Sequence, residues 1–351
     1  MRTRLVGTLL TAVLGASMLA ACGGDDADTA AQATVVEGND LQAVYEAAKK
    51  EGELVIYGPG EGLFSRVYED FKAAYPGIEI KTSVLFGSDL DSRLSGEQVA
   101  GGFQVDLIHI GDSDLGRYKP EGWLGQLTPA GENLPKEIIG GDGSWVIPSR
   151  QLYGIMYNTD KVKADEAPKS WKDLTDPKWK DRVATGDFTV SSSTAQVLSA
   201  AYSEGFIDDA WLKSLADNVK PKVFPSTTAA NDAVVTGEAS LLLTAYHGSF
   251  LDRQKEKAPV GFVLPEEGAY VSDFPYSMVE GARHPNAARL LVSWLLTKEG
   301  QESIVTKANT LGVMPDAPLP GDAGSYGDFK KITFPGDEKY ASAIETFGKF
   351  F

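Results

Sequence analysis

Tyrosine and histidine side chains that could hold a metal ion stand side by side at the end of one apolar run. Tyr246 and His247 follow residues 241–244, Leu-Leu-Leu-Thr, which have the character of a buried strand. Side chains at such strand ends converge on the clefts of α/β proteins, and a tyrosinate with a histidine could bind a hard ferric ion. The alternative is a rim aromatic that stacks on, or hydrogen-bonds to, an organic ligand, which is the commoner role.

Hydroxyl side chains begin two of the expected helices. Ser192, Ser193 and Thr194 precede one apolar-periodic run, and Thr227 precedes another. Helix N-termini of this kind receive carboxylate or phosphate groups, although each is also an ordinary N-cap. Arg150 either supplies a counter-charge or lies on the surface. The pair of helix ends favours a site for an anionic group.

Two loops at expected strand ends are glycine-rich or polar. Residues 58–62, Gly-Pro-Gly-Glu-Gly, include Gly60 and Glu61 and either present backbone N–H groups to a ligand or form a tight turn. They lack the Lys-Ser/Thr of a P-loop. Asp112 and Ser113 follow a later strand, but no downstream Asp-x-x-His and no G-x-S-x-G motif accompanies them. A ligand contact or helix cap is therefore favoured over a secreted hydrolase at Ser113.

The other reactive residues and the charge exclude several classes of protein. His109, His247 and His284 are far apart and have no partner at zinc-ligand spacing. The one cysteine, Cys22, cannot form an internal disulfide or a thiolate cluster. The chain has 33 Lys+Arg against 49 Asp+Glu, a formal net charge of −16. A chain this acidic is a poor ligand for nucleic acid or anionic lipid.

The first residues have the pattern of an export signal. Arginines precede an apolar stretch at residues 5–18, which is too short to span a bilayer comfortably. Small residues before the lone Cys22 resemble the lipobox of bacterial lipoproteins. The resemblance predicts removal of residues 1–21 and lipidation of Cys22, with a plain secretory signal as the alternative. Residues 22–39 have the composition of a flexible tether.

Short apolar strands alternate with amphipathic helices from residue 40 onward. The first run has strands expected at residues 54–57, 78–84, 105–110 and 151–158. A charged, proline-punctuated segment follows at residues 168–174. The second run has strands expected near residues 182–185, 240–244 and 260–264, and a further strand-like segment follows at residues 270–279. This alternation predicts an α/β fold with crossover helices, and the length of 351 residues favours two lobes.

Residues 41–305 resemble a known family at several points, in order. Residues 52–57 (Gly-Glu-Leu-Val-Ile-Tyr), 157–160 (Tyr-Asn-Thr-Asp), 168–174 (Pro-Lys-Ser-Trp-Lys-Asp-Leu) and 285–301 look like the corresponding segments of bacterial extracellular solute-binding proteins of ABC importers. The branch is the one with ferric-ion, thiamine, polyamine, phosphonate and sugar-phosphate binders. The resemblance implies a lipid-anchored, extracytoplasmic and monomeric binding protein, not an enzyme. It would use no cofactor and would deliver a small ligand to ABC permease subunits in the membrane.

The resemblance also implies the fold and the division of the chain. The expected fold is the α/β periplasmic-binding-protein type II fold, with two α/β lobes joined by two crossing strands. The first crossing strand matches residues 151–158, and the second should lie near residues 261–275. Lobe 1 would comprise residues 40–152 plus 272–351, and lobe 2 residues 153–271.

In this family, loops from both lobes contact the ligand in the cleft between them. Together with the residue-based candidates above, the positions that match these loops give one set of expected ligand-binding residues: Gly60, Glu61, Gly87, Ser88, Asp112, Ser113, Arg150, Ser192, Ser193, Thr194, Thr227, Tyr246, His247, Asp273 and Tyr276.

The chain departs from the ferric-ion binders of the family at three points. It has the single Tyr246 where they usually have two adjacent tyrosines, Pro-Gly-Glu at residues 59–61 where a His or Tyr is frequent, and Gln-Leu-Tyr at residues 151–153 in place of their anion-binding arginine strand. These departures favour a small organic ligand with an anionic group, such as a phosphonate, sugar phosphate or carboxylate. A ferric ion on Tyr246 and His247, or a polyamine or thiamine, is the alternative.

Overall fold

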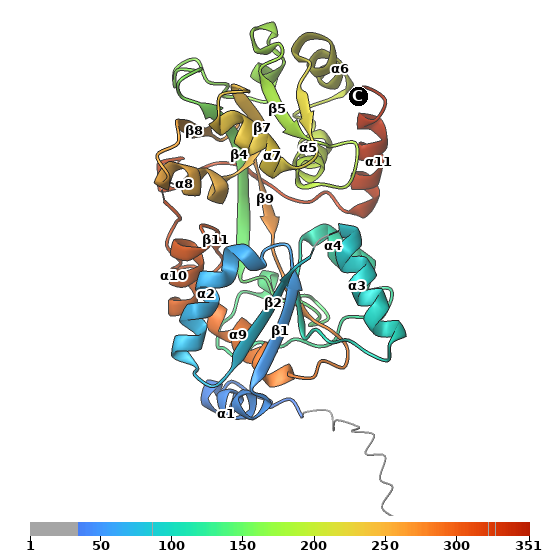
Figure 1. Ribbon diagram of the computed structural model, residues 1–351, viewed down its shortest axis with the longest axis vertical. Coiled ribbons are helices and arrows are strands. Elements are labelled where there is room, and N and C mark those ends of the chain that lie inside the picture. Colours follow the sequence, from blue (N-terminus) through green and yellow to red (C-terminus); the bar gives the residue numbers. More distant parts are fainter. Residues whose placement is uncertain (1–33, 86, 322, 327) are drawn as a thin grey trace, which may run out of the picture. The chain divides into compact units, whose positions relative to one another are not determined.

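The computed structural model describes residues 34–85, 87–321, 323–326 and 328–351. The predicted export signal, Cys22 and most of the predicted tether lie outside these residues. Within them the chain alternates strands and helices as expected and forms two β-sheets (Figure 1). Among the described helices, none combines the length and the apolar character needed to cross a bilayer.

The first sheet has the strand order β10-β3-β1-β2. Its strands β1, β2 and β3 are mutually parallel, and β10 runs antiparallel to β3. The strand bounds are β1 Glu53–Gly58, β2 Glu79–Val84, β3 Leu107–His109 and β10 Tyr276–Met278. The helices associated with this sheet are α1 Leu41–Glu51, α2 Glu61–Ala74, α3 Gly87–Val99, α4 Asp112–Tyr118, α9 Pro285–Leu295 and α10 Lys298–Lys307. We call this part the first lobe.

The second sheet has the order β12-β9-β4-β7-β5-β6, with β8 and β11 also paired to β4. Its strand bounds are β4 Ser149–Asn158, β5 Val183–Gly186, β6 Lys222–Phe224, β7 Leu241–Tyr246, β8 Val260–Val263, β9 Ala269–Asp273, β11 Leu311–Gly312 and β12 Lys331–Ile332. The helices associated with this sheet are α5 Ser193–Ser203, α6 Asp209–Ser214, α7 Thr227–Val235, α8 His247–Lys255 and α11 Asp337–Phe347. We call this part the second lobe.

Two antiparallel strands, β4 and β9, connect the lobes, as expected (Figure 1). Arg150 on β4 lies opposite Asp273 on β9. The single strand expected over residues 270–279 is instead divided into β9 and β10. Pro275 stands between them, and because proline has no N–H to donate it interrupts a strand ladder.

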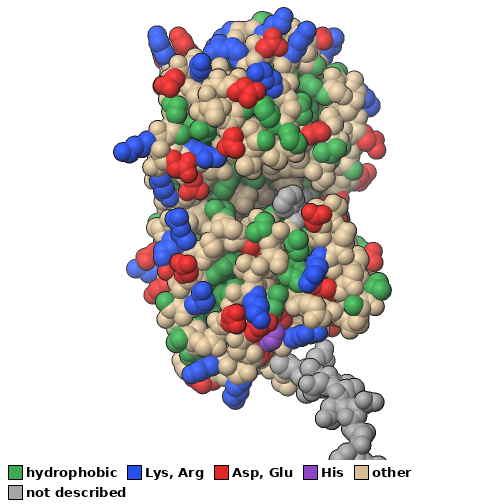
Figure 2. All heavy atoms as spheres, viewed as in Figure 1, with side chains coloured by type: hydrophobic (Ala, Val, Ile, Leu, Met, Phe, Trp, Pro, Cys, Tyr) green, Lys and Arg blue, Asp and Glu red, His purple; other side chains and the backbone are tan. Residues whose placement is uncertain are grey.

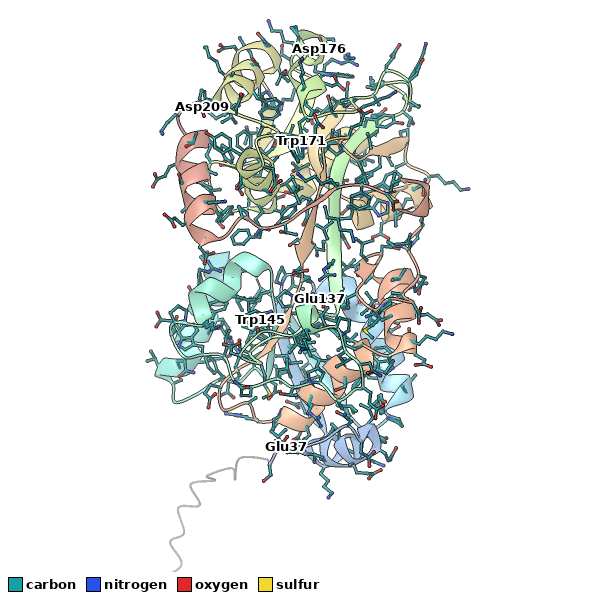
Figure 3. The ribbon with its side chains drawn as sticks, turned by 180° about the vertical axis from the view of Figure 1, so that it is seen from behind. Glu37, Glu137, Trp145, Trp171, Asp176 and Asp209 are labelled. Atoms are coloured by element: carbon teal, nitrogen blue, oxygen red, sulfur yellow. The ribbon has the colours of Figure 1, made fainter. Side chains whose placement is uncertain are left out.

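Each lobe has its own hydrophobic core. The first contains Phe64, Leu107 and Leu291, and Trp145 packs against it. The second contains Trp171, among other fully buried aromatic residues. Figure 3 shows the two labelled tryptophans, Trp145 and Trp171, in the two separate lobes.

The C-terminal helix lies on the other lobe from the one expected. Residues 272–351 were assigned to the first lobe, but Tyr340, Ala343 and Phe347 of α11 are buried in the core of the second. The Tyr340 hydroxyl also accepts a hydrogen bond of 3.1 Å from the backbone N–H of Ser192. The apolar face of α11 packs against α5 of the second lobe. The position of α11 is therefore set by this packing and not by its place in the chain. The other proposed lobe boundaries stay a prediction.

A buried carboxylate ties the start of β3 to the segment that leads into α9. Asp106 accepts hydrogen bonds of 2.9 Å from the backbone N–H groups of Val55, Arg283 and His284. Its Oδ2 also lies 2.8 Å from His284 Nδ1, and this contact raises the pKa of His284 above its ordinary value of 6.5. The pairing therefore stabilises the fold at pH values where His284 is protonated.

We expect this contribution to stability to disappear as the pH rises. A histidine with a raised folded-state pKa contributes fully below its unfolded-state pKa of about 6.5 and loses that contribution as the pH rises through the folded-state value. Denaturant unfolding of the wild type and of His284→Gln, from about pH 5.5 to about pH 9, should show a stability difference that shrinks with pH. A difference that is constant or grows with pH would contradict this assignment.

Candidate functional site

A pocket of about 420 Å³ lies on the second lobe, where β4, β7 and three helices meet. Figure 2 shows a hollow in the surface between the two lobes. The pocket is lined by Tyr153, Ser193, Thr227, Thr228, Asn231, Tyr246, Ser249, Asp252, Arg253 and Glu256. Three of these, Ser193, Thr227 and Tyr246, belong to the set expected from the sequence.

Two tyrosines from neighbouring strands form one wall of the pocket. Tyr153 of β4 and Tyr246 of β7 are directly opposite each other in the antiparallel register, and their ring centroids are 5.8 Å apart. The ring of Tyr246 also lies over Gly248, where a Cβ atom would come within 2.5 Å of it. The glycine leaves the space that this ring occupies, so the sequence Tyr-His-Gly positions the phenol.

Hydroxyl groups at the N-termini of α5 and α7 meet beside these tyrosines. Ser193 Oγ and Thr227 Oγ1 are 3.1 Å apart, and the buried Thr194 accepts a 3.0 Å hydrogen bond from Thr244. A Cβ atom at Gly186 would lie within 3.0 Å of the Thr194 and Thr227 hydroxyls. The last residue of β5 must therefore be small for the two helix ends to approach. The hydroxyls expected at one site are thus brought together.

Helix α8 supplies the charged side of the pocket. Arg253 pairs with Asp232 at 2.5 Å and with Glu256 at 3.0 Å. This arginine is therefore already neutralised by carboxylates. Asp252 accepts a 2.7 Å hydrogen bond from Asn309 Nδ2. Among the lining side chains, the carboxylates of Asp252 and Glu256 stand against the single guanidinium of Arg253. This excess of negative charge favours a cationic ligand over an anionic one on this side.

Burial sets the protonation state of the Tyr246 hydroxyl. Burial first, and then the neighbouring Tyr153 and Asp252, raise the pKa of Tyr246 well above its ordinary value of 10.0. The protonated hydroxyl donates to the backbone carbonyls of Ala308 and Asn309 at 3.4 and 3.3 Å. A ligand that takes this oxygen as a phenolate must therefore displace a proton.

His247 does not join Tyr246 in the pocket. Its side chain is buried, with 1% exposed, and its ring packs edge-on against Phe262 at 5.0 Å. Its Nε2 lies 3.3 Å from the hydroxyl of Tyr326. Successive residues at the start of α8 point in different directions, so the neighbouring imidazole enters the core while the phenol faces the pocket. The expected Tyr–His pair is not assembled.

Glu61 and Tyr276 are buried in the first lobe rather than exposed to a ligand. The Tyr68 hydroxyl lies 2.7 Å from both Glu61 Oε2 and the Tyr276 hydroxyl. His109 Nδ1 lies 3.0 Å from Glu61 Oε1, and the His109 ring stacks on that of Tyr276 with a centroid distance of 3.8 Å. Burial lowers the pKa of His109. These side chains satisfy one another inside the core and do not line the pocket.

The remaining expected residues also lie outside the pocket. Arg150 Nε lies 2.6 Å from Asp273 Oδ1, so these two form an ion pair across the connecting strands. Ser192 is the N-cap of α5, and its side chain accepts a hydrogen bond from the backbone N–H of Ala195. Gly60 is the N-cap residue of α2. Gly87 and Ser88 are exposed in the first turn of α3, and the side chains of Asp112 and Ser113 are outside the described part.

Several lining residues were missed from the sequence. Tyr153 was noted only as a departure from an arginine-containing strand. Asp252 and Arg253 belong to α8 and Glu256 is its C-cap, and no helix was expected there. Two signals were present. Tyr153 belongs to the strand expected at residues 151–158, and residues 247–255 directly follow the strand that carries Tyr246. Only the pairing of β4 with β7 shows that the two tyrosines face each other.

Comparison with known proteins shows the family to which this chain belongs. The family model for bacterial extracellular solute-binding proteins matches residues 109–338, which is more than half of the chain. The chain therefore belongs to this family, and its fold is the type II periplasmic-binding-protein fold predicted from the sequence. Members of the family bind a solute outside the cytoplasm and deliver it to an ABC importer, and this is the role of the present chain.

The chain is also similar to individual proteins whose names state a solute. Iron uptake protein A1 of Synechocystis sp. is 26% identical over 352 aligned positions, which cover 93% of this chain and 90% of that protein. Spermidine/putrescine-binding periplasmic protein 1 of Haemophilus influenzae is 24% identical, with 84% and 81% covered. The structure of iron-bound HitA from Pseudomonas aeruginosa superimposes with a TM-score of 0.67 and 20% identity, covering 85% of this chain and 99% of that one.

Proposed function

We propose that the solute is ferric iron and that Tyr246 and Tyr153 are its phenol ligands. The observation that supports the proposal is the direct opposition of these two tyrosines in the wall of the pocket. Phenolate and carboxylate oxygens are hard ligands of the kind that suit a ferric ion. Within the described residues no group of three or more His, Cys, Asp and Glu side chains could hold a metal ion, so the tyrosines are essential to this proposal.

Carboxylates on α8 and at its C-cap complete the proposed oxygen site. Asp252 and Glu256 line the same pocket as the two tyrosines. Glu256 also pairs with Arg253, so the excess negative charge that attracts a trivalent ion comes chiefly from Asp252. The similarity to an iron uptake protein and to an iron-bound structure supports the same choice. A ferric solute is cationic, whereas the sequence alone favoured an anionic one.

The experiment is a titration of the purified protein with ferric nitrilotriacetate, followed by visible absorption. Tyrosinate bound to iron gives a charge-transfer band, and proton release should accompany its appearance because the phenols must ionise. Spermidine, a phosphonate, a sugar phosphate and thiamine should be compared by thermal shift, since any ligand that binds the native state raises its stability. A colourless protein that is stabilised by one of these organic ligands would reject the ferric proposal.

The second candidate is a small anionic organic solute. It is favoured by the two hydroxyl-bearing helix N-termini, which meet with Ser193 and Thr227 at 3.1 Å in the same pocket. The positive ends of the two helices would receive the anionic group.

If an anion binds there, Ser193→Ala and Thr227→Ala should each weaken binding by about 1–3 kcal/mol, because a buried polar contact is lost. Calorimetric titration with the phosphonate or sugar phosphate that stabilises the wild type measures this loss. Ser95→Ala, at an exposed position on α3, is the matched control. Unchanged affinity in both pocket variants would exclude the Ser193 and Thr227 hydroxyls as contacts of the ligand.

We also propose that the protein is anchored to the membrane through a lipid on Cys22. The support is the lone cysteine behind small residues that follow an apolar stretch. A Cys22→Ala variant should move from the membrane fraction to the soluble fraction of cells, and labelling with radioactive palmitate should stop. A variant that remains membrane-associated and labelled would contradict the anchor.

A further inference from the structure

Asn309 joins the segment after α10 to the pocket of the second lobe. Helix α10 packs with α2 and α9 of the first lobe, and Ala308, which follows it, is fully buried in that core. Asn309 is itself 5% exposed. The chain then enters β11, which pairs with β4. This residue therefore stands where the first lobe meets the lining of the pocket.

Both ends of the Asn309 amide contact α8. Nδ2 donates to Asp252 Oδ1 at 2.7 Å, and Oδ1 accepts from Lys255 Nζ at 3.0 Å. The backbone of Asn309 has a φ of +53°, in the left-handed region that asparagine tolerates better than most residues. The two hydrogen bonds of the Asn309 side chain thus hold its backbone in this conformation.

The backbone of the same segment contacts the proposed ligand tyrosine. The Tyr246 hydroxyl donates to the carbonyls of Ala308 and Asn309 at 3.4 and 3.3 Å. One short segment from the first lobe therefore contacts the pocket in two ways. The Asn309 side chain bonds to α8, and the backbone carbonyls of Ala308 and Asn309 bond to Tyr246 of β7. A ligand bound to the Tyr246 oxygen competes directly with the second of these contacts.

We propose that residues 308–310 form a clasp, with Asn309 as its positioning residue, that holds the ligand-free pocket to the first lobe and is released when a ligand takes the Tyr246 oxygen. The contact between Asn309 and α8 keeps the clasp next to Tyr246. The release on binding rests on the proposed role of Tyr246, whereas the clasp itself does not. Binding of a ligand in the second lobe would in this way release a contact with the first lobe, which does not line the pocket.

The first test uses hydrogen exchange of the ligand-free, full-length protein. Tyr246→Phe and Asn309→Gly should each raise the exchange rate of amides in residues 308–312 by about fivefold, as expected for loss of one or two hydrogen bonds. Glycine accepts the positive φ without strain, so Asn309→Gly removes the side-chain contacts without forcing a new backbone conformation. Tyr202→Phe, which removes a hydroxyl bonded to Asp209 in the same lobe, should leave the segment unchanged. Exchange in Tyr246→Phe equal to that of the wild type would overturn the clasp.

A swap of polar groups tests the contact with α8 specifically. Asn309→Asp keeps the oxygen that accepts from Lys255 but replaces the amide donor that faces Asp252 with a second carboxylate oxygen. This variant should raise exchange in residues 308–312. Adding Asp252→Asn restores the hydrogen bond across this 2.7 Å contact, with the amide at position 252 now donating to the carboxylate at position 309. The exchange rate should return toward the wild-type value. A double variant that is no closer to the wild type than Asn309→Asp would reject Asn309 as the positioning residue.

The last arm adds ferric nitrilotriacetate to the wild type. Formation of the visible band should be accompanied by faster exchange in residues 308–312. A band with unchanged or slower exchange would reject the release while leaving the ferric proposal intact. Absence of the band would reject the ferric proposal, and the ligand-free variants would still decide whether the clasp exists.

Discussion

Tyr246→Phe should lower the affinity for ferric ion by about 100-fold or more and remove most of the visible band. Even groups that only support a metal ligand change affinity by about 10–100-fold, and here the ligand oxygen itself is lost. Phenylalanine keeps the ring that packs against Tyr153 and over Gly248, so the pocket wall should remain. Competition with a chelator measures the affinity, and absorption measures the band.

The pH dependence adds an independent check on this result. Since burial raises the pKa of Tyr246, the phenol is protonated in the free protein at neutral pH, and iron affinity should fall as the pH falls. Tyr153→Phe should produce a loss similar to that of Tyr246→Phe, whereas Tyr202→Phe should bind as the wild type does. If Tyr246→Phe retained both colour and affinity, the ferric site would have to lie elsewhere.

Asp106→Ala should reduce the free energy of unfolding by about 3–5 kcal/mol, the range observed when one partner of a buried ion pair is removed. Asp106 has 0% of its surface exposed and accepts hydrogen bonds from three backbone N–H groups and from the His284 side chain. Alanine leaves these donors without their acceptor, and each such group carries a desolvation penalty. Denaturant unfolding followed by tryptophan fluorescence provides the measurement.

Two controls make this result specific. Asp316→Ala removes a carboxylate from an exposed position and should change stability by less than about 0.5 kcal/mol. Asp106→Asn keeps the size and one acceptor oxygen but turns an amide toward the N–H groups, so it should also be destabilising. An Asp106→Ala protein as stable as the Asp316→Ala protein would show that the buried carboxylate does not hold β3 to the start of α9.

Local patterns were sufficient for most helices and strands and for part of the site. Hydroxyls ahead of apolar-periodic runs correctly predicted the N-termini of α5 and α7, because N-capping depends on residues close in sequence. The two ends meet at Ser193 and Thr227 because β5 and the two helices belong to one α/β unit. The position of Tyr246 at a strand end was likewise predictable.

Charge and residue type alone did not show which polar groups face a ligand. Glu61 and Tyr276 had the chemistry of ligand residues, yet they bond to Tyr68 in the core of the first lobe. His247 follows Tyr246 in sequence but faces Phe262. A side chain's direction depends on packing partners that are remote in the chain, and these partners are not encoded in the neighbouring residues.

The sequence by itself determined the alternation of elements, the α/β class, the two connecting strands and the membership of a solute-binding family. These follow from hydrophobic periodicity and from motifs that span a few residues each. Only the tertiary structure decided that Tyr153 opposes Tyr246, that α8 brings Asp252 to them, and that α11 packs on the second lobe. The reason is that strand register and helix packing are set by the sum of contacts between distant segments.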